Sequence, residues 1–391
     1  MSWLISLVFG RLPIGWLQLT HNRGRFIAAV SGVAFANLLV FMQLGIMGAL
    51  NDSTVAPYSL LNADIILSSE DGNTLTDSGH IPRVRMFQAL SVAGVAQSAP
   101  LFIGNLPFTL DDGSTVSLLN FGVDTAKPNF ASSSLTGSLR SLNVENTALL
   151  DQGTRGMPRT VIDDLTSGGK FSFETGGNTL TVVGTMEVGG GFLADGMMMM
   201  SDQTFLRFFP KRSSRAPNHI LIQTEVGVAT DVVVARLQNA LPAGNIKIQS
   251  MKDAAANDLI YMSTKRPTGI IFGFGVFMGV LVGLVIVYQV LSTDVADHLR
   301  EYATFKAMEF GQQFFLGIVL EEAIILGIFG FIPGFIVSMG LYAGLVSITG
   351  LPVMMSASRA IMVFLGTIVA CSASGAIATR RLAQADPADL F

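Results

Sequence analysis

The chain has 391 residues and a formal net charge of −4; half of its residues are hydrophobic and only 13% are charged. Soluble domains carry about 25% charged residues, so this composition indicates an integral membrane protein. The acidic balance, without any run of Lys or Arg, argues against a nucleic-acid partner. A single cysteine, Cys371, excludes an internal disulfide and any cysteine-based metal or redox motif.

Residues 1–25 predict a helix that lies in the membrane interface. Trp3 and Trp16 belong to its apolar face, whereas Arg11, Arg23 and Arg25 would face the anionic leaflet. The apolar stretch precedes the positive charges and no small-residue cleavage site follows, so a secretory signal is not expected. A frayed tail is the alternative.

Four stretches are long enough to cross a bilayer, which takes about 20 apolar residues at 1.5 Å each. The predicted transmembrane helices are residues 26–50, 266–292, 314–346 and 359–379. Asn37 and Gln43 are the polar interruptions of the first. The fourth has a small residue at every fourth position, a spacing that lets helices approach closely in a membrane: Gly366, Ala370, Ser374 and Ala378.

Positive residues near the ends of these helices predict the orientation. Those before the first helix, between the second and third, and after the fourth all fall on one side of a four-helix topology. Lys265, Arg266 and Arg359 lie on the other side. The majority therefore places both termini in the cytoplasm, with residues 293–313 and the tail 380–391 there, and a short loop, 347–358, outside.

Residues 51–265 form the predicted extracytoplasmic domain. A strand is expected at 63–69 and a helix at 83–90. Hairpins are expected to turn at Asp112–Gly113 and at Gly176–Gly177. Residues 218–250 read as strand, helix and strand, with Thr230 or Asp231 as the helix cap, and 129–147 as a mobile loop. The expected fold is thus an α-helical membrane protein with four transmembrane helices and a large α+β domain between the first and second.

The sequence contains no recognisable active site. The four histidines lie far apart and none has a partner at metal-ligand spacing. Gly169–Lys170 lacks the earlier glycine and the following Ser or Thr of a phosphate loop, so we expect neither ATP hydrolysis nor a cofactor in this chain. Met197–Met200 offer soft copper ligands, but consecutive strand residues point to opposite faces, which favours an apolar strand.

Two adjacent carboxylic residues, Glu321 and Glu322, lie inside the third predicted transmembrane helix. An ionisable residue at such a place is costly, so it suggests a function by default. We weigh a proton relay against a polar contact that fixes helix packing or a dimer seam. Their position, about two helical turns from the cytoplasmic end, favours the packing contact.

A charged segment, residues 293–313, separates the second and third transmembrane helices. Its apolar residues recur at three- and four-residue steps, which predicts an amphipathic helix, and Asp297 and Arg300 form a helix-supporting pair. Its net acidic polar face favours a protein partner over lipid headgroups. The predicted binding residues are Val295, Leu299, Arg300, Glu301, Tyr302, Phe305, Lys306 and Met308.

This segment resembles the corresponding part of FtsX/MacB-type (type VII) ABC permeases. The resemblance rests on Arg300, Glu301, Lys306 and Ala307, whereas the glycine of the family pattern falls where this chain has Glu309 or Phe310. The tail RRLAQADPADLF is similar to the closing signature of the family. WLQLTHNRGRF and VAFANLLVFMQLG look most like the DevC-type permeases of heterocyst-glycolipid-like exporters.

The resemblance implies a homodimer in the bacterial inner membrane, with a MacB-like periplasmic domain. It implies a separate ABC ATPase subunit, which binds ATP and Mg and holds residues 293–313 as a coupling helix. Closure of the dimer would move a lipid-like or hydrophobic substrate into a periplasmic adaptor (a membrane fusion protein) and, through it, a TolC-like outer-membrane channel, with membrane lipids as further partners. The alternatives are an FtsX-like signalling protein, a lipoprotein-release permease, and an ATP-independent transporter, against which the presence of only four spans argues.

Overall fold

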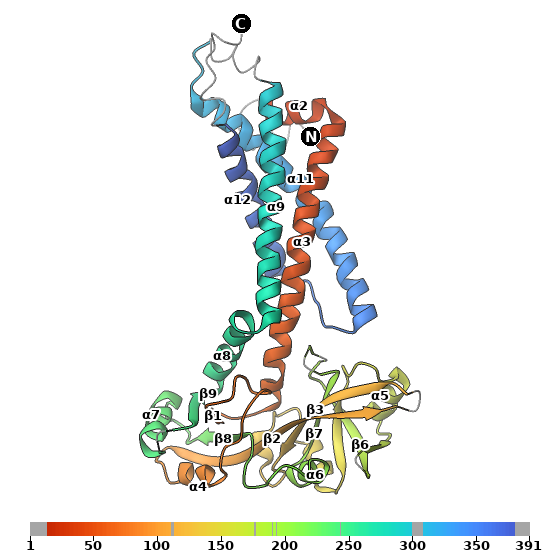
Figure 1. Cartoon of the computed structure of the whole chain (residues 1–391), viewed down its shortest axis with the longest axis vertical. Helices are drawn as coiled ribbons and strands as arrows, with labels where there is room; N and C mark the ends of the chain where they lie inside the picture. The colour runs from red at the N-terminus through yellow and green to blue at the C-terminus, as the bar shows by residue number, and fades with distance from the viewer. Residues whose placement is uncertain are drawn as a thin grey trace. The chain divides into compact units, whose positions relative to one another are not determined.

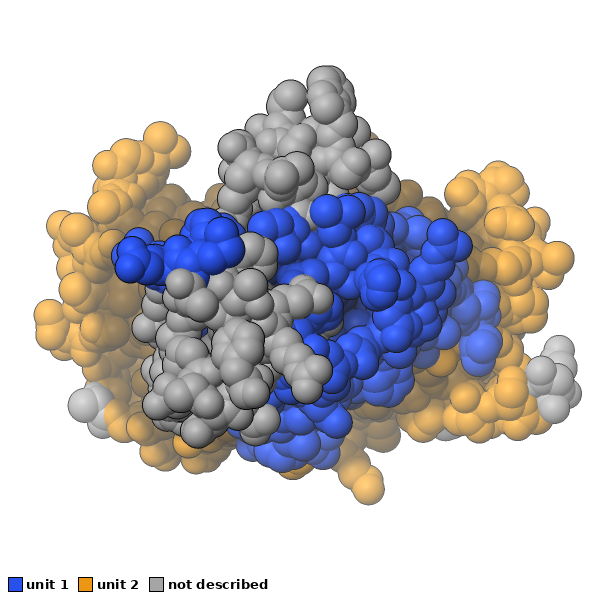
Figure 2. All heavy atoms as spheres, turned by 90° about the horizontal axis from the view of Figure 1, so that it is seen from above, with its two compact units in different colours: residues 1–48, 270–348, 353–391 blue, residues 49–269, 349–352 orange. Residues whose placement is uncertain are grey.

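The computed structural model describes residues 14–110, 113–175, 177–189, 191–192, 194–242, 244–298 and 308–379. The chain divides into two units. We call residues 1–48, 270–348 and 353–391 the membrane unit, and residues 49–269 and 349–352 the sheet unit. Figure 1 shows their elements, and Figure 2 colours the membrane unit blue and the sheet unit orange.

Long apolar helices dominate the membrane unit. Its described helices are α2 (Ile14–His21), α3 (Arg23–Val55), α9 (Pro267–Asp297), α11 (Gln312–Thr349) and α12 (Ala357–Ala378). All except α2 are long and apolar enough to cross a membrane. Each predicted transmembrane helix therefore corresponds to a helix in the structure, and α3 continues beyond both ends of the predicted stretch.

Small residues set the closest helix contacts in this unit. A Cβ added to Gly330 of α11 would lie 2.5 Å from Cβ of Val33 on α3, so only glycine allows this approach. On α12, the Ser374 hydroxyl donates to the Leu284 carbonyl of α9 at 3.2 Å. The small-residue face predicted on α12 thus divides: Ser374 and Ala378 are buried, whereas Gly366 is exposed.

The sheet unit is built on one mixed sheet, with strand order β5-β6-β4-β7-β3-β2-β8-β1-β9. The strands are β1 (Ile65–Ser69), β2 (Val95–Thr109), β3 (Thr115–Val123), β4 (Thr147–Asp151), β5 (Phe171–Thr175), β6 (Asn178–Met186), β7 (Gly196–Ser201), β8 (His219–Thr224) and β9 (Ile246–Ser250). The helices are α4 (Val84–Leu90), α5 (Arg159–Thr166), α6 (Asp202–Phe208), α7 (Thr230–Ala240) and α8 (Met251–Thr264), with short 3-10 turns at Ala56–Leu60, Pro128–Phe130 and Ser138–Asn143.

Both predicted hairpins form. β2 pairs antiparallel with β3 up to Thr109 and Thr115, and β5 pairs with β6 up to Thr175 and Asn178. The glycines at their turns, Gly113 and Gly177, have φ of 84° and 76°, in the left-handed region that glycine enters without strain. The predicted strand–helix–strand is β8, α7 and β9. Its predicted cap is wrong, because Ala229 is the N-cap of α7 and no side chain caps the helix.

The methionine run is a buried strand, as its alternation predicted. Met197 and Met199 of β7 belong to the apolar cluster on one face of the sheet, and Met198 and Met200 to the cluster on the other. All four side chains are at most 4% exposed. Among the described residues, no three His, Cys, Asp or Glu side chains are grouped so that they could hold a metal ion.

The stretch 129–147, expected to be a mobile loop, is instead part of the core. It contains the turns Pro128–Phe130 and Ser138–Asn143, and the side chains of Leu135, Leu139 and Leu142 are at most 5% exposed. The spacing of these leucines at three and four residues places them on one side of the chain, where they cover the Met199 face of the sheet. The serines between them concealed this pattern.

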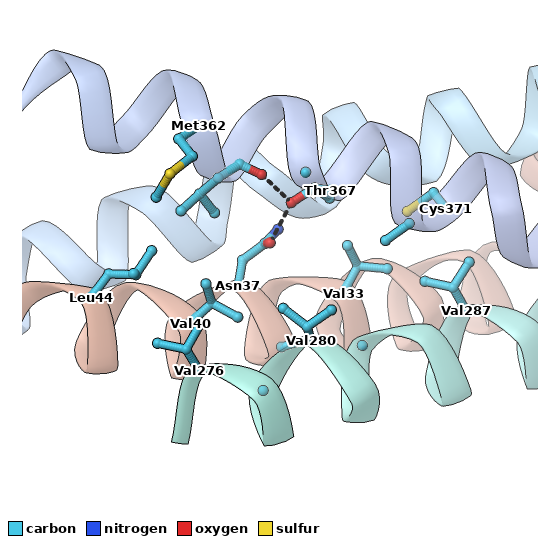
Figure 3. Close-up of a pocket in the computed structure, with 16 residues that line it drawn as sticks. Val33, Asn37, Val40, Leu44, Val276, Val280, Val287, Met362, Thr367 and Cys371 are labelled. Carbon is cyan, nitrogen blue, oxygen red and sulfur yellow. Dashed lines mark hydrogen bonds between the residues drawn. The ribbon is translucent and has the colours of Figure 1, made fainter. Parts of the chain in front are cut away.

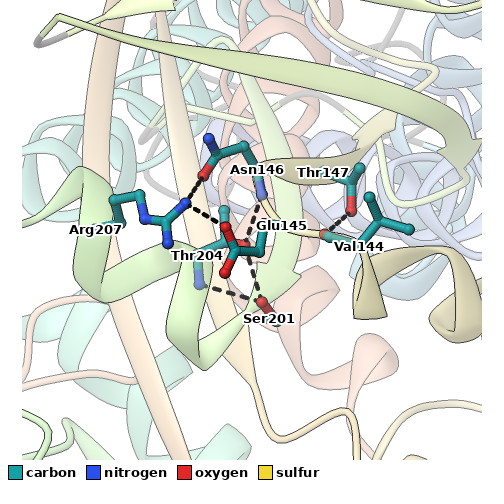
Figure 4. A network of polar contacts seen from close by, with 7 residues as sticks. All are labelled: Val144, Glu145, Asn146, Thr147, Ser201, Thr204 and Arg207. Carbon is teal, nitrogen blue, oxygen red and sulfur yellow. Dashed lines mark hydrogen bonds and ion pairs between the residues drawn. The ribbon is translucent and has the colours of Figure 1, made fainter.

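A polar network fixes the start of β4 against α6 (Figure 4). Asn146, with φ of 56°, adopts a left-handed conformation that asparagine tolerates better than most residues. Its backbone N–H donates to Thr204 Oγ1 at 3.3 Å, and its side chain accepts from Arg207 at 3.0 Å. Arg207 also pairs with Glu145 at 2.9 Å and lowers the pKa of that carboxyl group. Ser201 caps α6 by accepting from the Thr204 N–H.

Candidate functional site

The predicted ATPase-binding segment begins inside a transmembrane helix. Val295 lies in the last turns of α9, is 1% exposed, and packs in the same apolar cluster as Leu291 and Ile318. Met308 is 64% exposed and remains accessible to a partner. The other predicted binding residues, Leu299, Arg300, Glu301, Tyr302, Phe305 and Lys306, lie outside the described residues.

A single helix from 293 to 313 does not form. α9 ends at Asp297, residues 308–311 are not helical, and α11 begins at Gln312. Glu309 has φ of 63°, a left-handed conformation that is costly for most residues other than glycine. Asp297 forms an ion pair of 2.5 Å with Arg25 at the start of α3. Its expected partner, Arg300, lies outside the described residues.

Glu321 holds the first turn of α2. Its side chain is fully buried, and Oε1 accepts the backbone N–H of Trp16 at 3.3 Å. The first backbone N–H groups of a helix have no partner within the helix and carry the positive end of its dipole, so a carboxylate there is stabilising. This contact supports the packing hypothesis for the pair, and the proton relay is not needed to explain why Glu321 is in the membrane unit.

Glu322 lies beneath the same turn. A Cβ added to Gly15 would lie 2.9 Å from Cγ of Glu322 and 3.0 Å from the carbonyl oxygen of Ile318, so glycine lets α2 rest directly on α11. Trp16 adds ring contacts with Phe26, at 6.1 Å between centroids, and with Phe329, at 5.5 Å. Residues 14–21 are therefore a docked helix, and the frayed-tail alternative is wrong for them.

The sheet unit contains a buried polar cluster that the sequence analysis missed. Both the Tyr58 hydroxyl, at 2.7 Å, and the Leu75 N–H, at 2.8 Å, donate to Oδ2 of Asp258. The Leu75 carbonyl lies 2.9 Å from Nε2 of His219, whose Nδ1 lies 2.7 Å from Oγ of Ser68. Nε2 of His219 thus carries a proton, because a carbonyl can only accept.

Burial shifts the pKa values of Asp258 and His219 in this cluster. Asp258 is 4% exposed and His219 is 1% exposed. Removal from water raises the pKa of Asp258 and lowers the pKa of His219 to about 4. Both shifts favour the neutral form of the side chain, and for His219 this form persists throughout the physiological pH range.

The cluster connects the chain that leaves α3 with the chain that enters α9. Tyr58 lies shortly after Val55, where α3 ends, and Asp258 lies in α8, which leads to α9. Arg266 adds an ion pair of 2.8 Å with Asp77, on the same loop as Leu75. No local pattern identifies this contact, because Tyr58 and Asp258 are separated by 200 positions.

Part of the membrane unit is similar to a known protein family. Residues 273–387 match the family described as FtsX-like permease C-terminal. This stretch contains most of α9, the segment before α11, and all of α11 and α12. It includes residues 300–307, which carry the resemblance noted above, whereas the family match does not distinguish the DevC-type branch. No curated protein gives a significant match to the chain.

Two solved structures of outer domains are similar to part of this chain. The periplasmic region of MacB from Actinobacillus actinomycetemcomitans is 9% identical, with a TM-score of 0.35, over 50% of this chain and 92% of that one. The extracellular domain of the ABC-type transporter YknZ from Gram-positive bacteria is 11% identical, with a TM-score of 0.31, over 48% and 98%. Scores at this level do not establish a shared fold.

Proposed function

We propose that this chain is the membrane permease subunit of an ABC transporter whose ATPase is a separate protein. The observation that carries the proposal is the match of residues 273–387 to the FtsX-like permease C-terminal family. The four membrane-length helices, with the sheet unit inserted between the first and second, agree with such a subunit. Gly169–Lys170 does not match the phosphate-loop pattern, which agrees with ATP hydrolysis by a partner protein.

In this proposal the segment after α9 binds the ATPase. Two copies of the chain form the membrane dimer, both termini lie in the cytoplasm, and the ATPase binds ATP and Mg. Asp297 at the end of α9 pairs with Arg25 at the start of α3, so a force on the segment reaches both helices. Within the sheet unit, the Tyr58–Asp258 contact ties together the connections that lead from those helices.

The substrate class proposed is a lipid or another hydrophobic molecule, delivered to a periplasmic adaptor and an outer-membrane channel. Its support is the resemblance of WLQLTHNRGRF and VAFANLLVFMQLG to exporters of glycolipid type. Signalling to a periplasmic partner and lipoprotein release use the same permease architecture and remain the competing functions. The protein that is isolated with the complex distinguishes these three functions. An adaptor indicates export, a cell-wall hydrolase indicates signalling, and a lipoprotein carrier indicates lipoprotein release.

Alanine substitutions in the segment test the central claim. Leu299→Ala and Phe305→Ala remove apolar side chains proposed to bury against the ATPase, and loss of such a side chain from the centre of an interface costs about 2 kcal/mol or more, or at least about 30-fold in affinity. We expect both variants to reach the membrane at normal abundance while the co-purified ATPase and transport are lost.

Ile348→Ala is the matched control. Ile348 is 85% exposed and lies near the C-terminal end of α11, far in sequence from residues 293–313. This variant should retain the ATPase. Unchanged ATPase recovery with both Leu299→Ala and Phe305→Ala would contradict the proposed binding site, and native complexes that never contain an ATPase would contradict the proposed function itself.

A further inference from the structure

A slot opens in the membrane unit between α9 and α12, with α3 along its floor (Figure 3). Its volume is about 250 Å³. Val33, Val40 and Leu44 of α3, Val276 and Val280 of α9, and Met362 of α12 are among its lining side chains. Apart from the amide of Asn37 and the hydroxyl of Thr367, the lining consists of aliphatic side chains, glycines, Met362 and Cys371.

One polar group on the floor has a free hydrogen-bonding position. Asn37 is 5% exposed, and one end of its amide lies 2.6 Å from Thr367 Oγ1, whose single proton also has the Val363 carbonyl as an acceptor at 2.7 Å. The other end of the amide is buried and has no hydrogen-bond partner among the residues that the structure describes. An amide group without a partner is costly in an apolar environment, and in the hydrocarbon layer water is not available to compensate. This amide therefore favours a ligand with a hydroxyl group, which can both donate and accept.

The slot stays open because α12 has a glycine at its rim. A Cβ added to Gly366 would meet no atom within 4 Å, so the space beside this residue is empty of protein. The glycines of α9 differ: a Cβ on Gly279 would lie 3.0 Å from Val40, and one on Gly283 would lie 3.1 Å from Ala36. These glycines bring α9 against α3, whereas Gly366 leaves room for something else.

We propose that the slot binds one hydrocarbon chain of a membrane lipid, and that the Asn37 amide forms a hydrogen bond with a hydroxyl group on that chain. A helix of a second copy, about 10 Å across, would place only individual side chains in the slot, because packed helices interdigitate ridges with grooves. An extended hydrocarbon chain is much thinner and matches the apolar walls.

The depth of Asn37 decides which part of the lipid supplies the oxygen. Asn37 lies midway between Phe26 and Leu50, the ends of the predicted transmembrane stretch, and Thr367 lies midway along α12. Both are therefore near the centre of a hydrocarbon layer about 30 Å thick. Headgroup and ester oxygens lie at the surface of that layer, so the oxygen must be borne within the chain, as a hydroxyl group.

Photolabelling of the purified full-length protein tests this site without any transport assay, so its result is independent of the proposed function. The probe is a phosphatidylcholine with a diazirine on one acyl chain, and labelled peptides are mapped by mass spectrometry. The competitors are phosphatidylcholines with a stearoyl or a 12-hydroxystearoyl chain. We expect labels on α3, α9 and α12, and competition by the hydroxylated lipid at a concentration about 2- to 10-fold lower, as one hydrogen bond provides.

Three variants assign the effect to the slot. Gly366→Leu fills it and should abolish these labels, whereas Gly340→Leu on α11, where an added Cβ also meets nothing within 4 Å, should leave them unchanged. Asn37→Leu should keep the labels but remove the preference for the hydroxylated chain. Size-exclusion profiles identify any variant that misfolds; for such a variant, Asn37→Ala or Gly366→Val replaces the larger change.

Several results would overturn the proposal. Labels that persist in the Gly366 variants, or that disappear equally in Gly340→Leu, would mean that the probe binds elsewhere. Equal competition by the two lipids with the natural sequence would remove the role of Asn37. A Gly366→Leu protein that becomes monomeric while the natural sequence is dimeric would show that a second copy of the chain covers the slot.

Discussion

His219 shows how a residue without a sequence motif can control stability. It is buried in the sheet unit between Ser68 and the Leu75 carbonyl, with its pKa lowered to about 4 from an ordinary value of about 6.5. Between these two values the unfolded chain binds one more proton than the folded chain, so stability falls as the pH falls through this window. Above pH 6.5 the effect vanishes.

We therefore predict that His219 makes the protein sensitive to mild acid. Lowering the pH from 7 to 5.5 should destabilise the fold by about 1 kcal/mol through this residue alone. The measurement is the thermal midpoint of the purified protein in detergent at the two pH values, compared with His219→Gln. Asp258 and all other groups are common to both proteins, so the smaller pH dependence of the variant isolates His219. Identical pH dependence in both proteins would show that His219 titrates in the same way when folded and unfolded.

Some single residues could be interpreted correctly from the sequence because their requirements are local. Gly113 and Gly177 predicted their hairpins because a positive φ at a tight turn is a local requirement. Glu321 and Glu322 were identified because a carboxylate within an apolar stretch is conspicuous. Their partner was not predictable, since Trp16 lies 305 positions away from Glu321.

At the scale of elements, α2 is the least expected part of the membrane unit. It was predicted to lie on lipid headgroups, but Gly15 and Leu19 are buried and its first turn rests on α11. Leu17, 55% exposed, keeps an apolar surface directed away from the unit. The helix is thus held from one side by a carboxylate and by Trp16, and its other side remains available to lipid.

We predict that Gly15→Ala loosens this docking. The added Cβ would lie within 3.0 Å of Glu322 Cγ and of the Ile318 carbonyl, so α2 must shift away from α11 and weaken the Trp16–Glu321 contact. The expected loss is about 1–3 kcal/mol, from overpacking. Tryptic cleavage at Arg23, after α2, should accelerate, together with a lower thermal midpoint.

Gly24→Ala is the control, because an added Cβ there has its nearest neighbour at 3.6 Å, an ordinary contact. Alanine in an exposed helical position is neutral or slightly stabilising. Equal cleavage rates in Gly15→Ala and the natural sequence would mean that α2 is not held by this contact. Loss of transport in Glu321→Gln with α2 still protected would instead revive the proton-relay hypothesis.

At the scale of the whole molecule, the chain separates two environments. The helices of the membrane unit expose large apolar side chains along their length, such as Phe274, Phe277 and Ile336, which suits lipid contact. The sheet unit instead buries its apolar residues in clusters on both faces of the sheet. The charge distribution of the sequence predicts that this unit is extracytoplasmic and that the segment after α9 is cytoplasmic.

Cysteine labelling provides a test of that orientation. The only native cysteine, Cys371, is 1% exposed, so introduced cysteines can be followed with little background. Val226→Cys in the sheet unit and Met308→Cys before α11 both replace exposed residues. A membrane-impermeant maleimide should label Val226→Cys in intact spheroplasts, and Met308→Cys only after permeabilisation. The reverse pattern, or labelling of both in intact spheroplasts, would refute the predicted topology.

The sequence by itself determined the four membrane-length helices, the inserted domain and its hairpins, because length, hydropathy and turn chemistry are local properties. The tertiary structure alone decided which distant residues meet: Trp16 with Glu321, Tyr58 with Asp258, and Asn37 with Thr367. It also decided that Val295 packs inward and that Leu139 belongs to a core. Such contacts depend on how helices and strands pack against one another, and the residues that form them are not marked by any pattern in the sequence around them.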